Sequence, residues 1–384
     1  MPHETWSGAA TPTVEPRPPH LLYLMNDFVV QEHVCNLRCS YCLNFENVNL
    51  KDGAPWVPME RIDLNTGSYG WQRARQMLAR CRELGDAPIL RFAGGEIMAV
   101  HGSLAFIEEE AEHWDRVQVL TNATFLERDI ERLRKIPSLN LCCSVDGHTA
   151  ELNEMRTPNR TWAQRIINGM LAAIDAGVPV EVYTVLTQHN APALYEFADW
   201  LLGVRRTADV RLFPFPVRGD VGHKQRPTRE QYAALARVIE DYDRLSPILP
   251  PKGFLLRLYD FCMNEVRRFR CRVPLSFQQT FDDGVVASCS NCWASPLGNL
   301  LEDEHTFDQV GRANIHKLFL QDPPRFAFCK TCFTPFDVVN TYLDGLCTLD
   351  EMASLNLYSS PAARQRLQMM REAWSDGSAQ ALWS

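Results

Sequence analysis

The chain has 384 residues, of which 46% are hydrophobic and 22% charged, so it is large enough for one large globular domain and a smaller one. Its net charge of −8 argues against a general nucleic-acid binder, and no apolar run approaches the roughly 18 residues of a membrane span. The polar, proline-rich residues 1–20 predict a flexible tail rather than a signal peptide. Thirteen cysteines without an export signal favour the cytoplasm and thiolate–metal bonds.

From residue 21 onwards, apolar strand-like segments alternate with segments of helical spacing. The strand-like segments are 21–34, 87–94, 116–122, 140–147, 179–187 and 208–216. The helical segments are 66–84, 103–113, 125–135, 161–176, 191–203 and 228–244. This alternation predicts an α/β fold with a parallel sheet and outer helices. Six units are too few for a closed eightfold barrel, so we expect a partial (β/α)6 barrel over residues 21–246.

The pattern changes at "LSPILPPKGF" (245–254), where proline and glycine interrupt it. Residues 247–350 combine short strand signals, turns and several cysteines, which indicate a smaller α+β domain. Residues 351–384 regain helical spacing and predict a C-terminal helical segment that docks on the rest.

Cys35, Cys39 and Cys42 form a C-x3-C-x2-C loop directly after the first predicted strand. In parallel sheets the chemistry lies at the carboxyl ends of the strands, which is the position of this loop. Three thiolates can hold three irons of a [4Fe–4S] cube and leave the fourth iron open to a small molecule. The alternative is a closed zinc site in which His33 is the fourth ligand.

Further motifs follow in a fixed order along the chain. They are Tyr41 before the last cysteine, Gly94-Gly95-Glu96 after the second strand, Asn122 at the end of the third, Ser144 and Asp146 at the end of the fourth, and then Arg156. With this set, residues 21–240 resemble the radical S-adenosylmethionine (SAM) superfamily. The resemblance implies that the three cysteines bind a [4Fe–4S] cluster and that the other motifs bind SAM.

Individual roles follow from the same resemblance. Tyr41 would approach the adenine, residues 94–96 would hold the methionine amino group, and Ser144 and Arg156 would contact the ribose and carboxylate. Such enzymes reduce SAM with one electron from a donor such as flavodoxin or ferredoxin. The resulting 5′-deoxyadenosyl radical takes a hydrogen atom from an unactivated C–H bond, while the protein positions the substrate.

Two ligand sets compete for a second metal site. Cys289, Cys292, Cys329 and Cys332 form two CxxC pairs that suit structural zinc, although 36 residues separate the pairs. Cys271, Cys289, Cys329 and Cys332 resemble instead the auxiliary-cluster domains called SPASM and twitch. That resemblance implies one auxiliary [4Fe–4S] cluster, because the cysteine run of a full SPASM domain is incomplete here.

The remaining cysteines and arginines have less specific readings. Cys292 and Cys347 are core thiols, extra ligands or hydrogen-atom donors, whereas Cys81, Cys142 and Cys143 are expected in the core. The stretch "RRFRCR" (267–272) surrounds Cys271 with arginines, which form a solvated helix end or neutralise an anionic cluster.

The substrate is the least constrained part of the prediction. Relatives with one auxiliary cluster rework polar small molecules such as aminocyclitols, sugars and nucleosides, by dehydrogenation or epimerisation, and others crosslink or epimerise ribosomal peptides. Only 34 residues precede Cys35, which favours a small molecule over a peptide that needs a leader-binding domain. The basic stretch 205–229 could bind an acidic substrate or a peptide, or it is only a charged loop exposed to solvent.

Four histidines are equal candidates for a base: His101, His148, His189 and His223. The alternative of another class is an inactive Fe–S electron carrier or scaffold.

Overall fold

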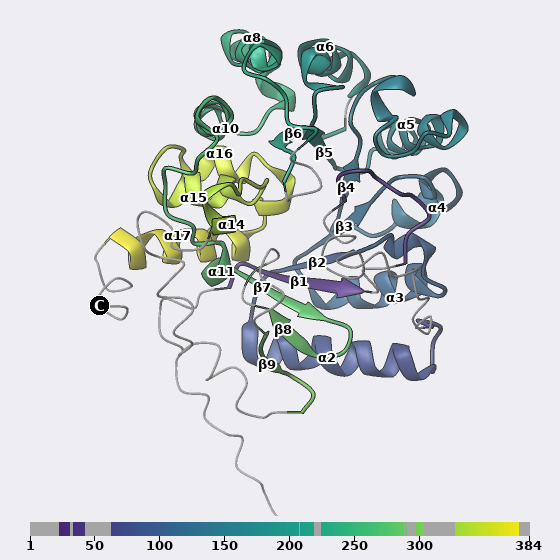
Figure 1. Ribbon diagram of the computed structural model, residues 1–384. Coiled ribbons are helices and arrows are strands. Elements are labelled where there is room, and N and C mark those ends of the chain that lie inside the picture. The colour runs from purple at the N-terminus through teal and green to yellow at the C-terminus, as the bar shows by residue number, and fades with distance from the viewer. Residues whose placement is uncertain are drawn as a thin grey trace, which may run out of the picture.

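The computed structural model describes residues 23–30, 34–42, 63–206, 208–218, 224–287, 289, 296–302 and 327–375. In these residues one nine-stranded sheet has the order β6-β5-β4-β3-β2-β1-β7-β8-β9 (Figure 1). Its first six strands are β1 (Met25–Val30), β2 (Ile89–Gly94), β3 (Arg116–Thr121), β4 (Leu139–Ser144), β5 (Val180–Leu186) and β6 (Val210–Pro216). All neighbouring pairs among them are parallel, as predicted.

A helix follows each of these strands and covers the outer face of the sheet (Figure 1). These helices are α2 (Tyr69–Gly85), α3 (Ser103–Glu110), α4 (Leu126–Leu133), α5 (Arg160–Asp175), α6 (Leu194–Val204) and α8 (Ala233–Glu240). Side chains close two of the helix starts: the Ser68 hydroxyl accepts from the Trp71 amide, and the Asn159 side chain accepts from the Thr161 and Trp162 amides. α2 precedes β2 and thereby completes the first unit. The partial (β/α)6 barrel is therefore confirmed.

The sheet continues past residue 246, where the smaller domain was predicted to begin. The added strands are β7 (Phe277–Phe281), β8 (Val285–Ala287) and β9 (Pro296–Asn299). β7 lies parallel to β1 at the edge opposite β6, and β8 and β9 extend it as antiparallel strands. The second segment is thus continuous with the first through hydrogen bonds between strands.

The helices after α8 fill the side of the barrel between its two edges (Figure 1). They are α9 (Tyr242–Leu245), α10 (Lys252–Asn264), α11 (Val273–Ser276), α14 (Ala327–Lys330), α15 (Asp337–Leu343), α16 (Leu349–Ala353) and α17 (Pro361–Ser375). Short 3-10 helices are η2 (Ile97–Ala99), η3 (Ala111–His113), η4 (Glu151–Asn153), η5 (Ala191–Ala193), η6 (Glu230–Tyr232), η7 (Ser246–Ile248) and η8 (Asn356–Tyr358). Arg366 of α17 donates to the Tyr23 carbonyl oxygen at 2.6 Å, which connects this helix to the residues before β1.

The two faces of the central strands differ in chemistry. Val117, Val119, Leu139 and Leu141 alternate with polar residues and are fully buried, as expected for the face that packs on helices. On the concave face the Gln118 amide of β3 donates to the Glu181 carboxylate of β5 at 2.8 Å, across the intervening β4. Both side chains lie on the same face of the sheet, so the barrel interior is polar at this level.

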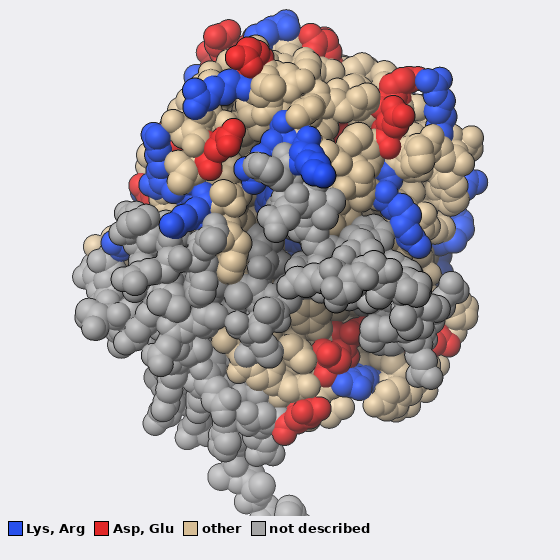
Figure 2. Space-filling view, in the orientation of Figure 1, with Lys and Arg blue, Asp and Glu red and all other residues tan. Residues whose placement is uncertain are grey.

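Acidic and basic side chains are interspersed over the outer helices (Figure 2). Two of the resulting ion pairs are Arg237 with Glu196 at 3.3 Å and Arg244 with Asp199 at 2.5 Å. Among the described residues, no helix is both long and apolar enough to cross a membrane.

Candidate functional site

The predicted cysteine loop lies at the carboxyl edge of the sheet, after β1. Cys35, Cys39 and Cys42 are all partly exposed. The Leu37 amide donates to the Cys35 sulfur at 3.4 Å, and the Cys42 amide donates to the Cys39 carbonyl oxygen at 3.1 Å. Burial raises the pKa of the Cys35 thiol to about 11 and that of Cys39 to about 12. The thiols must lose protons to ligate iron, so cluster binding and proton release are coupled at this loop.

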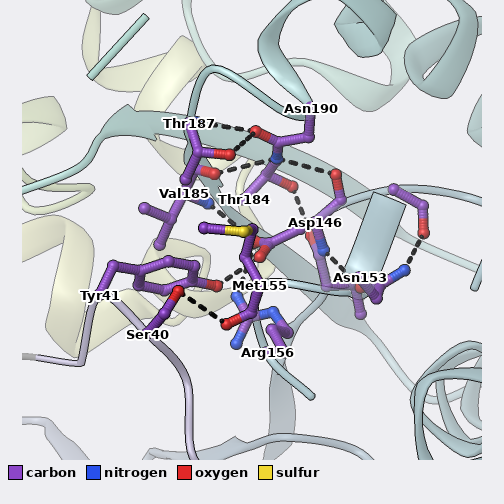
Figure 3. Close-up of polar contacts among 12 residues, drawn as sticks. Ser40, Tyr41, Asp146, Asn153, Met155, Arg156, Thr184, Val185, Thr187 and Asn190 are labelled. Atoms are coloured by element: carbon purple, nitrogen blue, oxygen red, sulfur yellow. Dashed lines mark hydrogen bonds and ion pairs between the residues drawn. The ribbon is translucent and has the colours of Figure 1, made fainter. Parts of the chain in front are cut away.

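A buried ion pair anchors the loop from the side of β4 and β5 (Figure 3). The Tyr41 hydroxyl donates to Asp146 Oδ2, and Arg156 donates to Asp146 Oδ1 at 2.8 Å. The Val185 amide donates to the same Oδ1 at 3.2 Å, while the Arg156 guanidinium lies 5.7 Å from the centre of the Tyr41 ring. Burial raises the pKa of Tyr41 well above its usual value, so the phenol stays a donor. These contacts connect the cysteine loop to two strands.

A second network anchors the loop from the side of β2 and β3. The Asn122 side chain donates to the Asn36 side chain at 2.8 Å and approaches the Cys35 sulfur at 3.8 Å. Asn36 in turn donates to the Thr124 hydroxyl at 2.9 Å. Asn122, predicted as a SAM ligand, therefore lies next to the first cysteine.

The Gly94-Gly95-Glu96 turn holds the ends of β1 and β2 in close contact. Gly94 has φ +146°, and a Cβ there would lie 2.0 Å from the Val30 carbonyl oxygen, so only glycine fits. The Glu96 carboxylate accepts from the Met98 amide, the Thr121 hydroxyl and the Asn122 amide. Burial raises the pKa of Glu96 to about 7, against these donors. The Glu96 side chain thus orders the turn, and its contact with the methionine amino group stays a prediction.

The residues predicted to contact the ribose and the carboxylate, Ser144 and Arg156, differ in exposure. Ser144 is the last residue of β4 and is partly exposed at the carboxyl edge. Arg156 is only 5% exposed and points toward Asp146 and Tyr41. In the described residues, Arg156 therefore acts first as the counter-ion of Asp146.

The donor set of the loop fits an iron–sulfur cluster. In a [4Fe–4S] cube each thiolate binds its own iron, so the sulfurs stand further apart than around one ion. His33, the fourth ligand of the zinc alternative, lies outside the described residues.

The second set of cysteines comes together from three separate segments. Cys271 precedes α11, Cys289 follows β8, Cys329 lies in α14 and Cys332 follows that helix. Burial raises the pKa of Cys329, and the charges of Cys271, Cys289 and Cys332 raise it further, so these three thiols lie within electrostatic range of Cys329. Cys292, the competing ligand, lies outside the described residues.

Arg267 is the arginine of the "RRFRCR" stretch that faces these thiols. Its guanidinium makes a two-bond ion pair with Asp337, at 2.8 and 3.0 Å, and its Nε donates to the Cys332 carbonyl oxygen at 2.9 Å. Asn340 donates to Asp337 at 2.7 Å and lies 4.0 Å from the Cys271 sulfur. Arg268, in contrast, is exposed beside Asp260. The stretch is thus partly a solvated helix end and partly a cation beside the cysteines.

The candidates for hydrogen-atom donor and base are dispersed. Cys347 is 4% exposed and has Glu351, Arg371 and Arg257 as its charged neighbours. His101 is a surface residue beside Asn65, His148 packs against both Phe197 and Trp200, and His189 contacts the Glu151 carbonyl oxygen. His223 lies outside the described residues. Cys81, Cys142 and Cys143 are buried, as expected.

Sequence reasoning missed the polar residues inside the barrel. Asp27, Arg91, Gln118 and Glu181 are all at least nine-tenths buried and belong to four different strands. A signal was present, because each interrupts an apolar strand at alternating positions, as in "RVQVLT" and "VEVYTVL".

Comparison with known proteins agrees with this geometry. Residues 33–201 match the family model described as the radical SAM superfamily. Molybdenum cofactor biosynthesis protein 1 of Drosophila melanogaster is 27% identical over 194 residues, which cover 50% of this chain and 32% of that protein. Neomycin C epimerase of Streptomyces fradiae is 27% identical over 154 residues, which cover 40% of this chain and 44% of the epimerase. The chain therefore spans less than half the length of either relative.

Solved structures share the fold at low sequence identity. Native anSMEcpe with bound AdoMet and a Cp18Cys peptide superimposes with a TM-score of 0.54 at 13% identity, over 94% of this chain and 99% of that one. The family match begins just before the cysteine loop and ends in α6, so it includes the loop, the Gly94 turn and the Asp146–Arg156 pair. Residues 33–201 therefore match the radical SAM superfamily, whose family cofactors are a [4Fe–4S] cluster and S-adenosylmethionine.

Proposed function

We propose that this protein is a radical SAM enzyme that removes a hydrogen atom from a polar small molecule, namely an aminocyclitol, sugar or nucleoside, in a dehydrogenation or epimerisation. The observation that carries the proposal is the three-thiol loop at the carboxyl edge of the sheet, anchored on both sides by buried contacts. When bound, the cluster and SAM supply a 5′-deoxyadenosyl radical. A low-potential donor such as flavodoxin or ferredoxin provides the electron.

The residues of this chain have separate tasks in the proposed enzyme. Cys35, Cys39 and Cys42 hold the cluster, and Tyr41, Asp146 and Arg156 fix the position of the loop. Gly94 and Gly95 let the backbone approach the methionine end of SAM. Ser144 presents a hydroxyl at the same edge for the ribose.

The second part of the proposal is one auxiliary [4Fe–4S] cluster on Cys271, Cys289, Cys329 and Cys332. Support comes from the electrostatic effect of the other three thiols on Cys329 and from Arg267, a buried cation that acts on Cys271 and Cys332. Cys292 and Cys347 remain candidates for a thiol that returns a hydrogen atom in an epimerisation. The described neighbours of Cys347 give that role no support.

The substrate class is supported by the likeness to neomycin C epimerase, whose name denotes a small-molecule substrate. The second candidate, maturation of a ribosomal peptide by crosslinking or epimerisation, is favoured by the fold shared with anSMEcpe, which was solved with a peptide bound.

The first test is iron, sulfide and zinc analysis of the anaerobically reconstituted protein, together with SAM cleavage after reduction. About eight irons without zinc, and formation of 5′-deoxyadenosine, are expected from two cubes. About four irons with one zinc would make the second site structural. Absence of 5′-deoxyadenosine would favour the electron carrier or scaffold.

A variant assigns the irons to their sites. The Cys35→Ala, Cys39→Ala and Cys42→Ala triple variant should lose SAM cleavage and keep about four irons, because one cube remains. Retention of about eight irons would contradict the assignment. Cys81→Ala is the matched control, since this thiol is buried in α2 and should leave the iron content unchanged.

A further inference from the structure

A belt of polar side chains crosses the inner face of the barrel at one level. Asp27 of β1 lies opposite Arg91 of β2, which lies opposite Gln118 of β3, which lies opposite Asn140 of β4. Glu181 of β5 joins the belt through its hydrogen bond from Gln118. Five consecutive strands of a parallel sheet thus each place a polar residue on a face that such sheets normally fill with Val, Ile and Leu.

The belt is incompletely paired within the described chain. Asp27 Oδ1 and Arg91 Nε form an ion pair at 3.4 Å without a hydrogen bond. Arg91 Nη1 and Gln118 Oε1 also have no hydrogen-bond partner among the described residues, whereas Glu181 has the Tyr183 side chain beside its carboxylate. All of these side chains are at least nine-tenths buried, and a buried polar group without a partner is costly. A ligand with several hydroxyl or amino groups would supply the missing partners.

The belt is covered on the side where the strands begin. The Arg91 guanidinium lies 4.6 Å from the centre of the Phe336 ring, which stacks on Phe277, the first residue of β7. Tyr358 of η8 also lies near the belt: burial raises the pKa of its phenol, and the charge of Glu181 raises that pKa further. η8 is fixed there because Arg116, the first residue of β3, donates to the Asn356 carbonyl oxygen at 3.2 Å.

The opposite side of the belt is more accessible. Leu120, Ser144 and Val185 lie two or more positions further along β3, β4 and β5 and are partly exposed. These positions are at the carboxyl edge, where the cysteine loop lies. A molecule that enters beside the loop therefore meets Leu120, Ser144 and Val185 first, and Tyr183 and the belt lie beneath them.

We propose that Asp27, Arg91 and Glu181 form a recognition site for a compact polyhydroxylated or aminated molecule. The unpaired carboxylate and amide oxygens accept from hydroxyl or ammonium groups, and the unpaired guanidinium nitrogens donate to hydroxyl oxygens. Two carboxylates face one guanidinium, so the site accommodates an amino-polyol better than an acid. This inference rests on the proposed function and narrows its substrate class.

The test measures binding of defined probes to the reconstituted, SAM-saturated protein by isothermal titration calorimetry. The probes are 2-deoxystreptamine, a diaminocyclitol; scyllo-inositol, a neutral polyol; and cyclohexanol, which has one hydroxyl. We expect binding in that order. Glu181→Gln and Arg91→Lys should each weaken diaminocyclitol binding about 10- to 100-fold, the effect of one hydrogen bond to a charged group.

Two further variants separate recognition from stability. Glu110→Gln is the matched control, because Glu110 is fully buried in α3 beside Arg82, outside the barrel, and should bind the probes like the parent. The second is an Asp27→Asn and Arg91→Gln double variant, which removes both charges of the ion pair. Because neither charge is then left buried without its partner, this variant should fold even where a single neutralised partner prevents folding. A purely structural belt would lower the melting temperature of the variants without changing probe affinity.

The outcomes for the two proposals differ. A parent protein that forms 5′-deoxyadenosine but binds the cyclitols no better than cyclohexanol overturns the recognition site alone. Equal affinity of the parent, Glu181→Gln and Arg91→Lys proteins for the diaminocyclitol does the same. A parent protein without SAM cleavage overturns the proposed function, whatever it binds.

Discussion

At the residue scale, Asp146 is the group on which the position of the cysteine loop depends. Its carboxylate accepts from Tyr41, Arg156 and the Val185 amide. Tyr41→Phe should lower the free energy of unfolding by about 2 kcal/mol, because one hydrogen bond to a buried carboxylate is lost. Asp146→Asn should lower it by about 3–5 kcal/mol, because Arg156 is left buried without a counter-charge. Urea denaturation of the cluster-free protein measures both.

Tyr195→Phe is the matched control for this prediction. Its hydroxyl also donates to a carboxylate, Asp241, at 2.8 Å, but both groups are partly exposed. The loss should therefore stay below about 1 kcal/mol. Equal effects of Tyr41→Phe and Tyr195→Phe would mean that the Asp146 contact does not anchor the loop.

Glu181 should make stability depend on pH in the neutral range. Burial raises its pKa from 4.5 to about 7, with a further rise from Asp209 and opposition from the Gln118 hydrogen bond and Arg91. A raised pKa means that the folded state holds the proton more tightly, so this contribution is complete below pH 4.5 and is lost as pH rises through about 7. The difference corresponds to about 3 kcal/mol. The Glu181→Gln variant should not show this fall in the free energy of unfolding as pH rises. If the free energies of parent and variant run parallel between pH 4 and about 8, the pKa of Glu181 is not raised.

Some site residues could be identified from the sequence, and others only from the structure. The cysteine spacing and the Gly-Gly-Glu turn are local patterns, and a local pattern is visible in one sequence. Tyr41 and Asp146 are 105 residues apart, and their pairing depends on how β4 lies beside the loop. Glu181 was overlooked because an isolated acid in an apolar strand carries no motif. Its importance appears only when five strands place their polar residues at one level.

At the element scale, the turn after β2 decides how closely the first two strands meet. Gly94→Ala should destabilise the protein by about 3 kcal/mol or more, because the new Cβ meets the Val30 carbonyl oxygen and the backbone has φ +146°. Gly203→Ala is the control, since nothing lies within 4 Å of its Cβ position in α6 and helical glycine is unfavourable. That change should stabilise by about 0.5–1 kcal/mol. Thermal denaturation measures the stability of both variants. Similar changes for Gly94→Ala and Gly203→Ala would mean that the close contact of Gly94 with Val30 does not limit residue 94 to glycine.

The existence and order of the six strand–helix units were predictable, because apolar period and helix spacing are properties of single segments. The pairing of β7 with β1 was not, since about 250 residues separate Met25 from Phe277 and no local signal records their contact. The predicted boundary at 246 marks a change of pattern, but the hydrogen-bonded sheet crosses it.

At the scale of the whole molecule, the helices after β9 connect the second set of cysteines to the base of the barrel. Phe336 contacts Arg91 of the belt, and the next residue, Asp337, pairs with Arg267 beside the thiols. The backbone of Arg267 is fixed as well, because its amide donates to the Lys330 carbonyl oxygen at 2.7 Å. One short segment thus touches both the barrel interior and the proposed auxiliary site.

Arg267→Gln should therefore disrupt the second cysteine set and leave the first intact. The ion pair has side chains 1% and 0% exposed, so loss of one partner leaves a buried charge and costs about 3–5 kcal/mol locally. Iron content after reconstitution should fall from about eight to about four per chain, while the loop of Cys35, Cys39 and Cys42 keeps its cube. Arg268→Gln, one residue away but exposed beside Asp260, should keep about eight. If the Arg267→Gln protein also holds eight irons, the cation has no part in the second site. If it holds none, the two sites fold as one unit, because damage beside Cys332 then reaches the loop through Phe336 and the belt.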